Sequence, residues 1–387
     1  MKLLRNILDK IEPNFHKGGK LEKLFPLYDA IDTILYVPNE TADHGPYIRD
    51  HVDVKRSMIF VVLALIPCLL FGIYNAGLQT AINEGNTSIG FIDLFIKGAF
   101  SVVPMYMVVF AVGGACEALF AVIRNHEINE GFLVTGMLIP LVMPPTIPLW
   151  MLGIATAFGI IIGKEIFGGT GFNVFNPALT ARAFIFFAYP TTMSGDKVWS
   201  IDGMSGATPL LKISSEKGQD AISFLGNYSW YDMFIGFIPG SVGETSTLCC
   251  LIGAFFLLIT GIASWRTMCA VIIGMLMMTF IMNQFGQLIG SSNPMLFIPP
   301  HYHFVMGGFA FGMVYMATDP VSSAHTHKGM WYYGILIGAM CVLIRVINPA
   351  YPEGMMLAIL FANAFAPLFD YYVLEANVKR RMARYGK

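Results

Sequence analysis

The sequence predicts an all-α polytopic membrane protein with about ten transmembrane helices in two inverted five-helix repeats. Of its 387 residues, 55% are hydrophobic and only 13% are charged, and the mean hydropathy is +0.62. Soluble domains carry about 25% charged residues, so lipid is the expected solvent for most of this chain. The opening stretch MKLLRNILDKIEPNFHKGGKLEK is too rich in charge for a secretory signal, which predicts a cytoplasmic start.

The expected helices are segments that approach the roughly 20 apolar residues needed to cross a bilayer. In chain order they cover residues 58–78, 98–123, 131–148, 149–167, 178–190, 247–263, 267–289, 303–318, 331–347 and 354–374. The third contains Pro140, Pro144 and Pro145, and the fifth is short. Broken or short helices are tolerated at membrane depth only where they are buried in protein or line a cavity.

The distribution of basic residues predicts the orientation. Ten crossings that begin in the cytoplasm leave nineteen Lys and Arg residues inside and five outside. This asymmetry follows the positive-inside rule and predicts that both termini are cytoplasmic. The expected organisation is a cytoplasmic segment 1–57, a first repeat 58–190, an outer loop 191–246, a second repeat 247–374 and a basic cytoplasmic tail 375–387.

Because each block holds an odd number of helices, the second block is inverted relative to the first. FNPALTARAF at 175–184 and ATDPVSSAHT at 317–326 each set a polar residue before a proline at a predicted cytoplasmic helix end. Inverted repeats with interrupted helices are common in transporters and channels. Coincidence is the alternative explanation for so short an internal similarity.

Two acidic residues, Glu117 and Asp370, fall near the cytoplasmic ends of predicted helices two and ten. Charge inside a bilayer is costly, so it usually marks a transport pathway or a buried pair. Carboxylate oxygens suit a small hard cation. A structural pair, with Arg124 for Glu117 or with Lys379 for Asp370, is the alternative interpretation.

Two further patterns are open to two interpretations. In the junction GGTGFNVFNP, Asn173 and Asn176 offer amide donors and acceptors, while Asn176 before Pro177 also predicts a helix N-cap with proline at the first helical position. Phe311 and Tyr315 are spaced i, i+4 and share a helix face, either as packing or as a constriction on an ion path.

The outer loop contains the stretch DGMSGAT at 202–208, which offers a hydroxyl on a turn with little steric cover. Taken alone, it is explained by a plain surface turn. Its D-x-x-[ST]-G-A-[ST] pattern resembles the target motif of flavin transferases, which join FMN through its phosphate to the last Thr or Ser. The residues that match are Asp202, Ser205, Gly206, Ala207 and Thr208.

The rest of the chain resembles the B subunits of Na+-translocating NADH:quinone oxidoreductases over nearly its whole length. The resemblance is carried by stretches such as NFHKGGKLEKLFPLYDA, VGGACEALFAVIRNHEINEGF, KEIFGGTGFNVFNPAL and GGFAFGMVYMATDPVS. The D subunits of ion-translocating ferredoxin:NAD+ oxidoreductase complexes share the core and the flavin motif. They resemble this chain less, notably in the segment NFHKGGKLEKLFPLYDA.

The resemblance implies two flavins. FMN is expected as a phosphoester on Thr208, with Asp202 read by a separate flavin transferase. A noncovalent riboflavin is expected at Asn173 and Asn176. Electrons would pass from these flavins toward a quinone, either ubiquinone or menaquinone.

The resemblance also implies an ion path and a quinone site. Glu117 and Asp370 correspond to sodium-uptake residues, and Phe311 and Tyr315 to a constriction on the sodium path. The glycine pair Gly113–Gly114 corresponds to the quinone site, although a glycine pair in a membrane helix usually means close helix packing.

The implied function is that of one subunit in a six-subunit complex of the bacterial inner membrane that exports Na+. Its expected partners are the other subunits, the flavin transferase and membrane lipid, with no nucleic acid. No dinucleotide-binding unit or iron–sulfur cysteine spacing is visible in the sequence, so NADH oxidation and the clusters are expected in other subunits. We expect no metal site at the two His-x-His pairs. A passive channel of the same fold is the alternative from another functional class.

Overall fold

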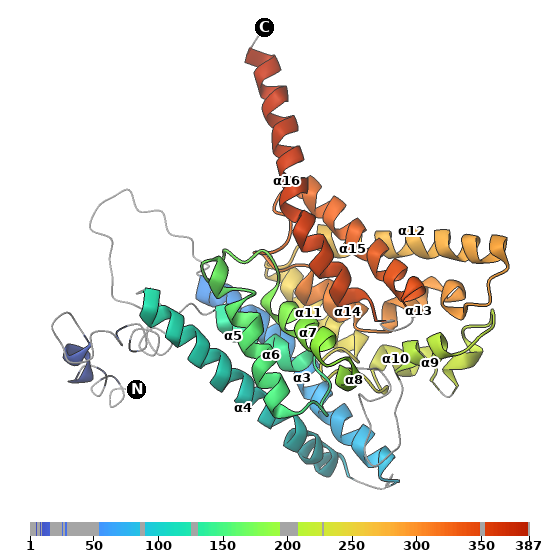
Figure 1. Ribbon diagram of the computed structural model, residues 1–387, viewed down its shortest axis with the longest axis horizontal. Coiled ribbons are helices and arrows are strands. Elements are labelled where there is room, and N and C mark those ends of the chain that lie inside the picture. The colour runs from blue at the N-terminus through green and yellow to red at the C-terminus, as the bar shows by residue number, and fades with distance from the viewer. Residues whose placement is uncertain are drawn as a thin grey trace.

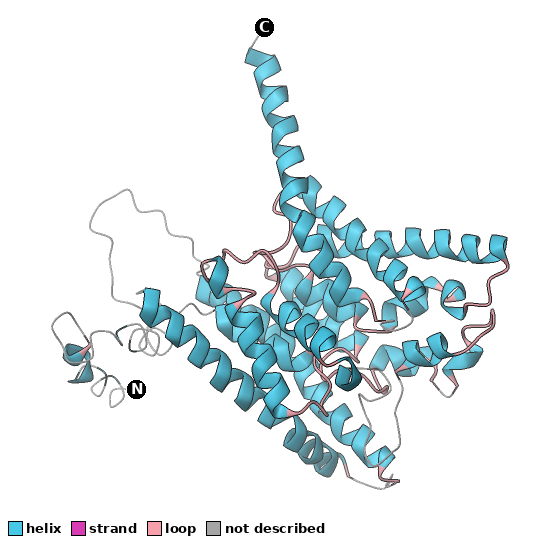
Figure 2. Cartoon of the chain, in the orientation of Figure 1, coloured by secondary structure: helices cyan, strands magenta, loops and turns pink. Residues whose placement is uncertain are grey.

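The computed structural model describes residues 54–85, 90–124, 131–193, 208–226, 228–348 and 353–385, together with residues 5, 8, 10–15, 25 and 28. Every regular element within these residues is a helix, and none of them forms a strand (Figure 2). The prediction of an all-α polytopic membrane protein is therefore confirmed.

The first half of the chain forms two long helices followed by three short ones. They are α3 (Val54–Asn83), α4 (Phe91–Arg124), α5 (Gly131–Leu141), α6 (Leu149–Ile161) and α7 (Pro177–Ala188). The short elements η1 (Glu12–Asn14), η3 (Glu165–Phe167) and α8 (Pro190–Met193) accompany them. Two small surface helices, α9 (Pro209–Ser215) and α10 (Trp230–Ile235), lie between the halves, with η4 (Ser223–Leu225).

The second half contains α11 (Thr247–Ile259), α12 (Trp265–Ile289), α15 (His327–Ile347) and α16 (Met355–Tyr385). Between α12 and α15 the chain forms η5 (Pro294–Phe297), α13 (Pro300–Val305), α14 (Phe309–Phe311) and the π-helix η6 (Gly312–Met316). Figure 1 shows α12 lying along α15, and the last turns of α16 projecting away from the rest of the molecule.

Six described helices are long and apolar enough to cross a membrane, and three more, α5, α7 and α11, are apolar but shorter. These nine correspond to nine of the ten predicted spans. The remaining prediction, the eighth in chain order, was one continuous helix over 303–318, and it is wrong. Gly307 and Gly308 adopt φ of 62° and 65° there and break the segment into α13, α14 and η6. The number of crossings and the inverted repeats stay predictions.

Polar side chains set where several helices begin. Asn176 accepts hydrogen bonds from the backbone of Ala178 and Leu179 at the start of α7, and Pro177 occupies the first turn, which confirms the N-cap prediction. Ser246, Ser264 and Thr326 cap α11, α12 and α15 in the same way. The non-helical stretches before these helices are consequently fixed in place.

Glycines permit the long helices to approach closely. A Cβ at Gly77 of α3 would lie 1.8 Å from the carbonyl oxygen of Leu94 in α4, and one at Gly338 of α15 would lie 2.0 Å from that of Val271 in α12. Such small residues drive helix association in lipid, where the hydrophobic effect contributes little. The exposed outer faces of α4 and α12 are correspondingly apolar, with Phe100 78% and Leu288 85% exposed.

The short helices leave non-helical backbone in the interior. The stretch after α5 pairs with the stretch before α11, because Val242 N donates to Met143 O at 3.1 Å and Gly243 N donates to Leu141 O at 2.8 Å. Irregular backbone at membrane depth needs such partners. Two cavities lie beside these irregular stretches.

Candidate functional site

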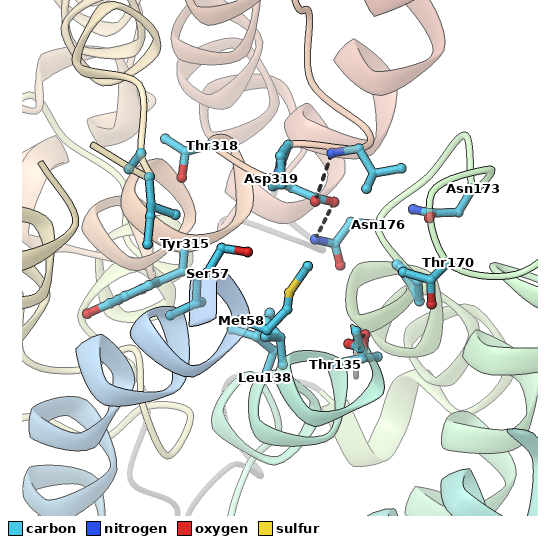
Figure 3. A pocket seen from close by; sticks show the side chains of 18 of the residues that line it. Ser57, Met58, Thr135, Leu138, Thr170, Asn173, Asn176, Tyr315, Thr318 and Asp319 are labelled. Atoms are coloured by element: carbon cyan, nitrogen blue, oxygen red, sulfur yellow. Dashed lines mark hydrogen bonds between the residues drawn. The ribbon is translucent and has the colours of Figure 1, made fainter. Parts of the chain in front are cut away.

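A cavity of about 260 Å³ lies where the start of α3, the helix α5, the loop before α7 and the end of η6 converge (Figure 3). Its polar lining comes from distant parts of the sequence: Ser57, Thr135, Lys164, Thr170, Asn173, Asn176, Thr318 and Asp319. We call it the inner cavity, because the predicted topology puts these segments near the cytoplasmic face.

Both predicted asparagines line the inner cavity. Asn176 uses its side-chain oxygen to cap α7 while its Nδ2 donates to Asp319 Oδ2 at 3.4 Å (Figure 3). Asn173 donates from Nδ2 to the carbonyl oxygen of Phe175 at 3.0 Å. The two interpretations of Asn176 are therefore compatible, since one amide group caps a helix and borders the cavity.

Asp319 is a cavity residue that the sequence reasoning missed. Its carboxylate accepts hydrogen bonds from Ser322 Oγ at 2.7 Å and from Val321 N at 3.2 Å. The available signal was an aspartate directly before Pro320 in an apolar segment. The site that it joins depends on contacts with Asn176, which lies 143 positions away.

The inner cavity has the character of a small-molecule site. Such sites are mostly apolar, hold a few well-placed polar groups and have volumes of about 300–1,000 Å³, and this cavity of about 260 Å³ lies just below that range. Thr170 Oγ1 is buried and has no hydrogen-bond partner among the described residues, and Thr170 lines this cavity. An orphaned buried hydroxyl beside two amides fits a ligand with several hydrogen-bonding atoms, as a flavin ring has.

Tyr315 forms the opposite wall of the inner cavity from Asn173 and Thr170 (Figure 3). Its hydroxyl donates to Ala64 O at 2.8 Å, and its ring centroid lies 5.0 Å from that of Phe311. A Cβ at Gly253 would lie 1.7 Å from this hydroxyl, so glycine is required there. The two rings are in contact as predicted, but Tyr315 belongs to a π-helix rather than an α-helix.

Glu117 forms an ion pair with Lys164, and their side chains are only 5% and 3% exposed. Lys164 also lines the inner cavity, so the pair connects α4 with its wall. The predicted structural partner, Arg124, instead contacts Glu165, donating to its carbonyl oxygen at 2.6 Å. Glu117 is thus paired with Lys164, and the predicted pairing with Arg124 is wrong.

Asp370 lies on α16, away from the inner cavity lining. Its carboxylate accepts from the backbone nitrogens of His325 at 2.7 Å and Thr326 at 2.9 Å, just before α15 begins. Lys379, the predicted structural partner, pairs with Glu375. The carboxylate therefore stabilises the start of a helix, and the structure does not bring Asp370 and Glu117 into one site.

The two glycines of the α4 pair, Gly113 and Gly114, lie in different environments. A Cβ at Gly113 would lie 2.5 Å from the ring of Phe132 and 2.7 Å from Ile160 Cδ1, whereas one at Gly114 would meet nothing closer than 3.8 Å. Gly113 therefore serves close packing, whereas at Gly114 a Cβ would be in ordinary van der Waals contact with Phe132.

A second, much smaller cavity of about 20 Å³ lies beside Thr208. Thr208 is only 5% exposed, and its Oγ1 has no hydrogen-bond partner among the described residues. It precedes Pro209 at the start of α9 without capping that helix through its side chain. We call this space the outer cavity. Asp202, Ser205, Gly206 and Ala207 lie outside the described residues.

A buried cluster of charges adjoins the outer cavity. Arg182 of α7 pairs with Glu244 and, at 2.7 Å, with Glu353 Oε2, and it also donates to Val142 O at 2.6 Å. Arg345 is fully buried and donates to the carbonyl oxygens of His303 at 2.8 Å and Met306 at 2.6 Å. The Arg182 guanidinium thus connects three non-helical stretches, at Val142, Glu244 and Glu353, and no pattern in the sequence had indicated it.

The surface around α9 is partly shielded from water. Burial lowers the pKa of Lys212, whose ammonium lies 4.2 Å from the ring centroid of Tyr228, and burial raises the pKa of Tyr228. The ammonium–ring contact holds α9 against the segment that follows it.

Comparison with known proteins gives a consistent result over the full chain. The model of the NQR2, RnfD, RnfE family matches residues 41–379. The B subunit of the Na(+)-translocating NADH-quinone reductase of Chromohalobacter salexigens is 52% identical over 402 residues, covering 98% of this chain and 96% of that protein. The B subunits of the same reductase from Klebsiella pneumoniae strain 342 and Pseudomonas aeruginosa strain PAO1 are each 49% identical, covering 98% and 99% of this chain.

Proposed function

Because the chain belongs to the NQR2, RnfD, RnfE family, we propose that it acts as the B subunit of a Na+-translocating NADH-quinone reductase, passing electrons toward quinone while Na+ is exported. The observation that carries the proposal is identity of about 50% along nearly the whole chain. The protein works with the other subunits of a six-subunit complex in the bacterial inner membrane, with both termini in the cytoplasm.

Thr208 carries FMN through a phosphoester bond made by a flavin transferase. The buried Oγ1, which has no hydrogen-bond partner among the described residues, supports this assignment. In a phosphoester this oxygen carries no hydrogen, so the free-energy cost of burying an unpaired hydroxyl donor no longer applies. A covalent bond also retains a cofactor at the outer face, where a noncovalent one could be lost.

The inner cavity holds the riboflavin. Asn173, Asn176 and the orphaned hydroxyl of Thr170 support this assignment because they can bind and orient the polar edge of a flavin ring. A bound flavin accepts and donates single electrons, which is the chemistry that the chain's own side chains lack. The apolar lining, including Leu138, Leu257 and Val314, excludes water from the ring.

Loss of either cavity amide is expected to lower noncovalent flavin and leave covalent flavin unchanged. Asn176→Ser keeps a good helix cap for α7 but removes the amide, and Asn173→Ala removes an amide that caps nothing. One lost hydrogen bond is worth about 0.5–1.5 kcal/mol, so the loss should weaken riboflavin binding by roughly two- to tenfold. Acid extraction followed by flavin chromatography measures the noncovalent pool.

The matched control is Asn377→Ser on the projecting part of α16, which should leave both flavin pools unchanged. Full riboflavin occupancy in both cavity variants would show that riboflavin does not bind in the inner cavity.

Sodium enters through Glu117 and Asp370 and passes the constriction at Phe311 and Tyr315. Quinone is reduced beside the glycine pair Gly113–Gly114 of α4, as the family resemblance implies.

Removing the charge of Glu117 or Asp370 is expected to raise the sodium concentration required for half-maximal quinone reduction. Glu117→Gln and Asp370→Asn keep the shape of each side chain, and loss of one charged oxygen ligand should raise that concentration by about tenfold. Steady-state rates over a sodium series at constant ionic strength measure it. The control is Glu375→Gln, an exposed carboxylate on the same helix as Asp370. Sodium dependence equal to that of the control would remove the residue from the path.

The ferredoxin:NAD+ complexes are the alternative, since the matched family includes their D subunits by name. Reduction of quinone rather than NAD+ by the purified complex separates the two.

A further inference from the structure

A groove of about 380 Å³ lies between the start of α15 and the second half of α16. Lys328 and Tyr332 line it from α15, one helical turn apart. Tyr372, Ala376 and Arg380 line it from α16 at successive steps of four residues, so they share one face of that helix. This α15–α16 groove shares no lining residue with the inner or the outer cavity.

The length of α16 and the aromatic residues of the groove place it at the surface of the membrane. About 20 helical residues cross the hydrocarbon layer. Because α16 has 31 residues, a helix that enters this layer at Met355 leaves it near Leu374. Tyr332 and Tyr372 lie at that level and are 55% and 60% exposed, as is typical of tyrosines at the boundary with the headgroups. The groove therefore faces the headgroup layer, which the predicted topology makes the cytoplasmic one.

The groove presents two positive charges that no carboxylate of the described residues balances. Neither Lys328 nor Arg380 forms an ion pair within that part of the chain. Helix α15 contains no acidic residue, and α16 contains two. Of these, Glu375 pairs with Lys379 at 2.7 Å, and Asp370 accepts hydrogen bonds from the backbone before α15. The two free basic side chains consequently favour an anionic ligand.

The face of α16 that lines the groove continues into the membrane as an apolar stripe. Leu368 lies one turn before Tyr372 and Phe361 two turns before Leu368, and both apolar side chains are 43% exposed. A soluble anion gains nothing from such a stripe, whereas the acyl chains of a phospholipid pack against it. Basic pockets between membrane helices on the cytoplasmic side are typical sites for anionic lipid headgroups. The stripe thus favours a lipid over a free phosphate.

We propose that the α15–α16 groove binds one anionic phospholipid of the surrounding membrane, with its phosphate between the Lys328 ammonium and the Arg380 guanidinium. The acyl chains lie along the stripe at Leu368 and Phe361. The bound lipid connects the start of α15 to the part of α16 that leaves the membrane. The site goes beyond the proposed function, because it depends on neither flavin nor sodium.

The test uses the purified whole complex, delipidated in a sugar detergent, and phosphatidylglycerol that carries a photoactivatable diazirine near its headgroup. Mass spectrometry of the cross-linked peptides is expected to show saturable labelling at the start of α15 and in the second half of α16. Excess unlabelled phosphatidylglycerol should compete with this labelling, whereas phosphatidylcholine and inorganic phosphate should not.

Variants of the two basic residues test the position of the phosphate. Lys328→Gln and Arg380→Gln should each raise the lipid concentration at half-maximal labelling by about fivefold, the usual effect of one basic residue beside anionic lipid. Arg380→Lys keeps the charge and should retain most of the affinity. The matched control, Arg381→Gln, removes the same charge one position along, from a residue that does not line the groove, and should have a smaller effect. All three side chains are exposed, so the variants are expected to fold.

Three results would overturn the proposal. Labelling that inorganic phosphate displaces would show that the groove binds a soluble anion instead of a lipid. Equal shifts for Arg380→Gln and Arg381→Gln would show that general surface charge, and no defined site, attracts the lipid. Complete lack of labelling in the two helices would show that another subunit covers the groove in the complex. The flavin assignments would stand after any of these results, since the labelling does not depend on flavin.

Discussion

Replacing Thr208 with valine is expected to abolish covalent flavin in a chain that still folds and inserts. Valine has nearly the same shape as threonine but lacks Oγ1, the only atom that can form the phosphoester. The position is 5% exposed and its hydroxyl has no partner among the described residues, so the substitution removes an unpaired polar atom and breaks no hydrogen bond within that part of the chain. Flavin fluorescence of the denatured band and the mass of the peptide containing residue 208 measure the result.

Thr208→Ser is the matched control, because it retains a hydroxyl at the same place and should keep the fluorescent band. The experiment requires cells that make the full complex and the flavin transferase. A fluorescent Thr208→Val band would show that Thr208 is not the attachment point of the flavin, and the assignment of FMN to this residue would be wrong.

Arg182→Met is expected to destabilise the protein by about 3–5 kcal/mol, the usual cost of removing one partner from a buried ion pair. The substitution leaves the carboxylates of Glu244 and Glu353, 5% and 17% exposed, without the guanidinium that now contacts both. It also removes the hydrogen bond to Val142 O. Unfolding by increasing SDS fraction in mixed micelles, followed by tryptophan fluorescence, measures the loss.

Two comparisons make this result specific. Lys97→Met breaks an ion pair between Lys97 and Glu84, whose side chains are 34% and 43% exposed respectively. This substitution should lower the free energy of unfolding by no more than about 1 kcal/mol. Adding Glu244→Gln and Glu353→Gln to Arg182→Met should recover part of the loss, since the buried negative charges are then gone. Equal stability of the Arg182→Met and Lys97→Met proteins would show that the cluster contributes little.

Local signals in the sequence predicted the helices well, because hydropathy and capping act over neighbouring residues. Asn176 before Pro177 identified the start of α7 for this reason. The break at Gly307 and Gly308 was not predicted, because the segment stays apolar throughout and hydropathy does not report backbone conformation. The π-helix at Tyr315 was not predicted for the same reason.

The candidate site was predicted only in part, because its contacts are distant in the sequence. Lys164 lies 47 positions from Glu117, and Glu353 lies 171 positions from Arg182, so no spacing pattern connects them. Resemblance to a family supplied Asn173 and Asn176, which do line one cavity, but it supplied neither Asp319 nor the arginine cluster. Burial of charge is decided by tertiary packing, which a single sequence does not display.

The short helices α5, α7 and α11 contain 11, 12 and 13 residues, so at 1.5 Å per residue each spans about 16–20 Å of a hydrocarbon layer about 30 Å thick. On the proposed sodium path, a barrier at Phe311 and Tyr315 would take most of the membrane voltage. Carrying one elementary charge through that voltage involves about 2.3 kcal/mol per 100 mV. On that path nearly all the electrical work of transport would be done within one or two helical turns, and the position of the two aromatic rings would decide when that work can be performed.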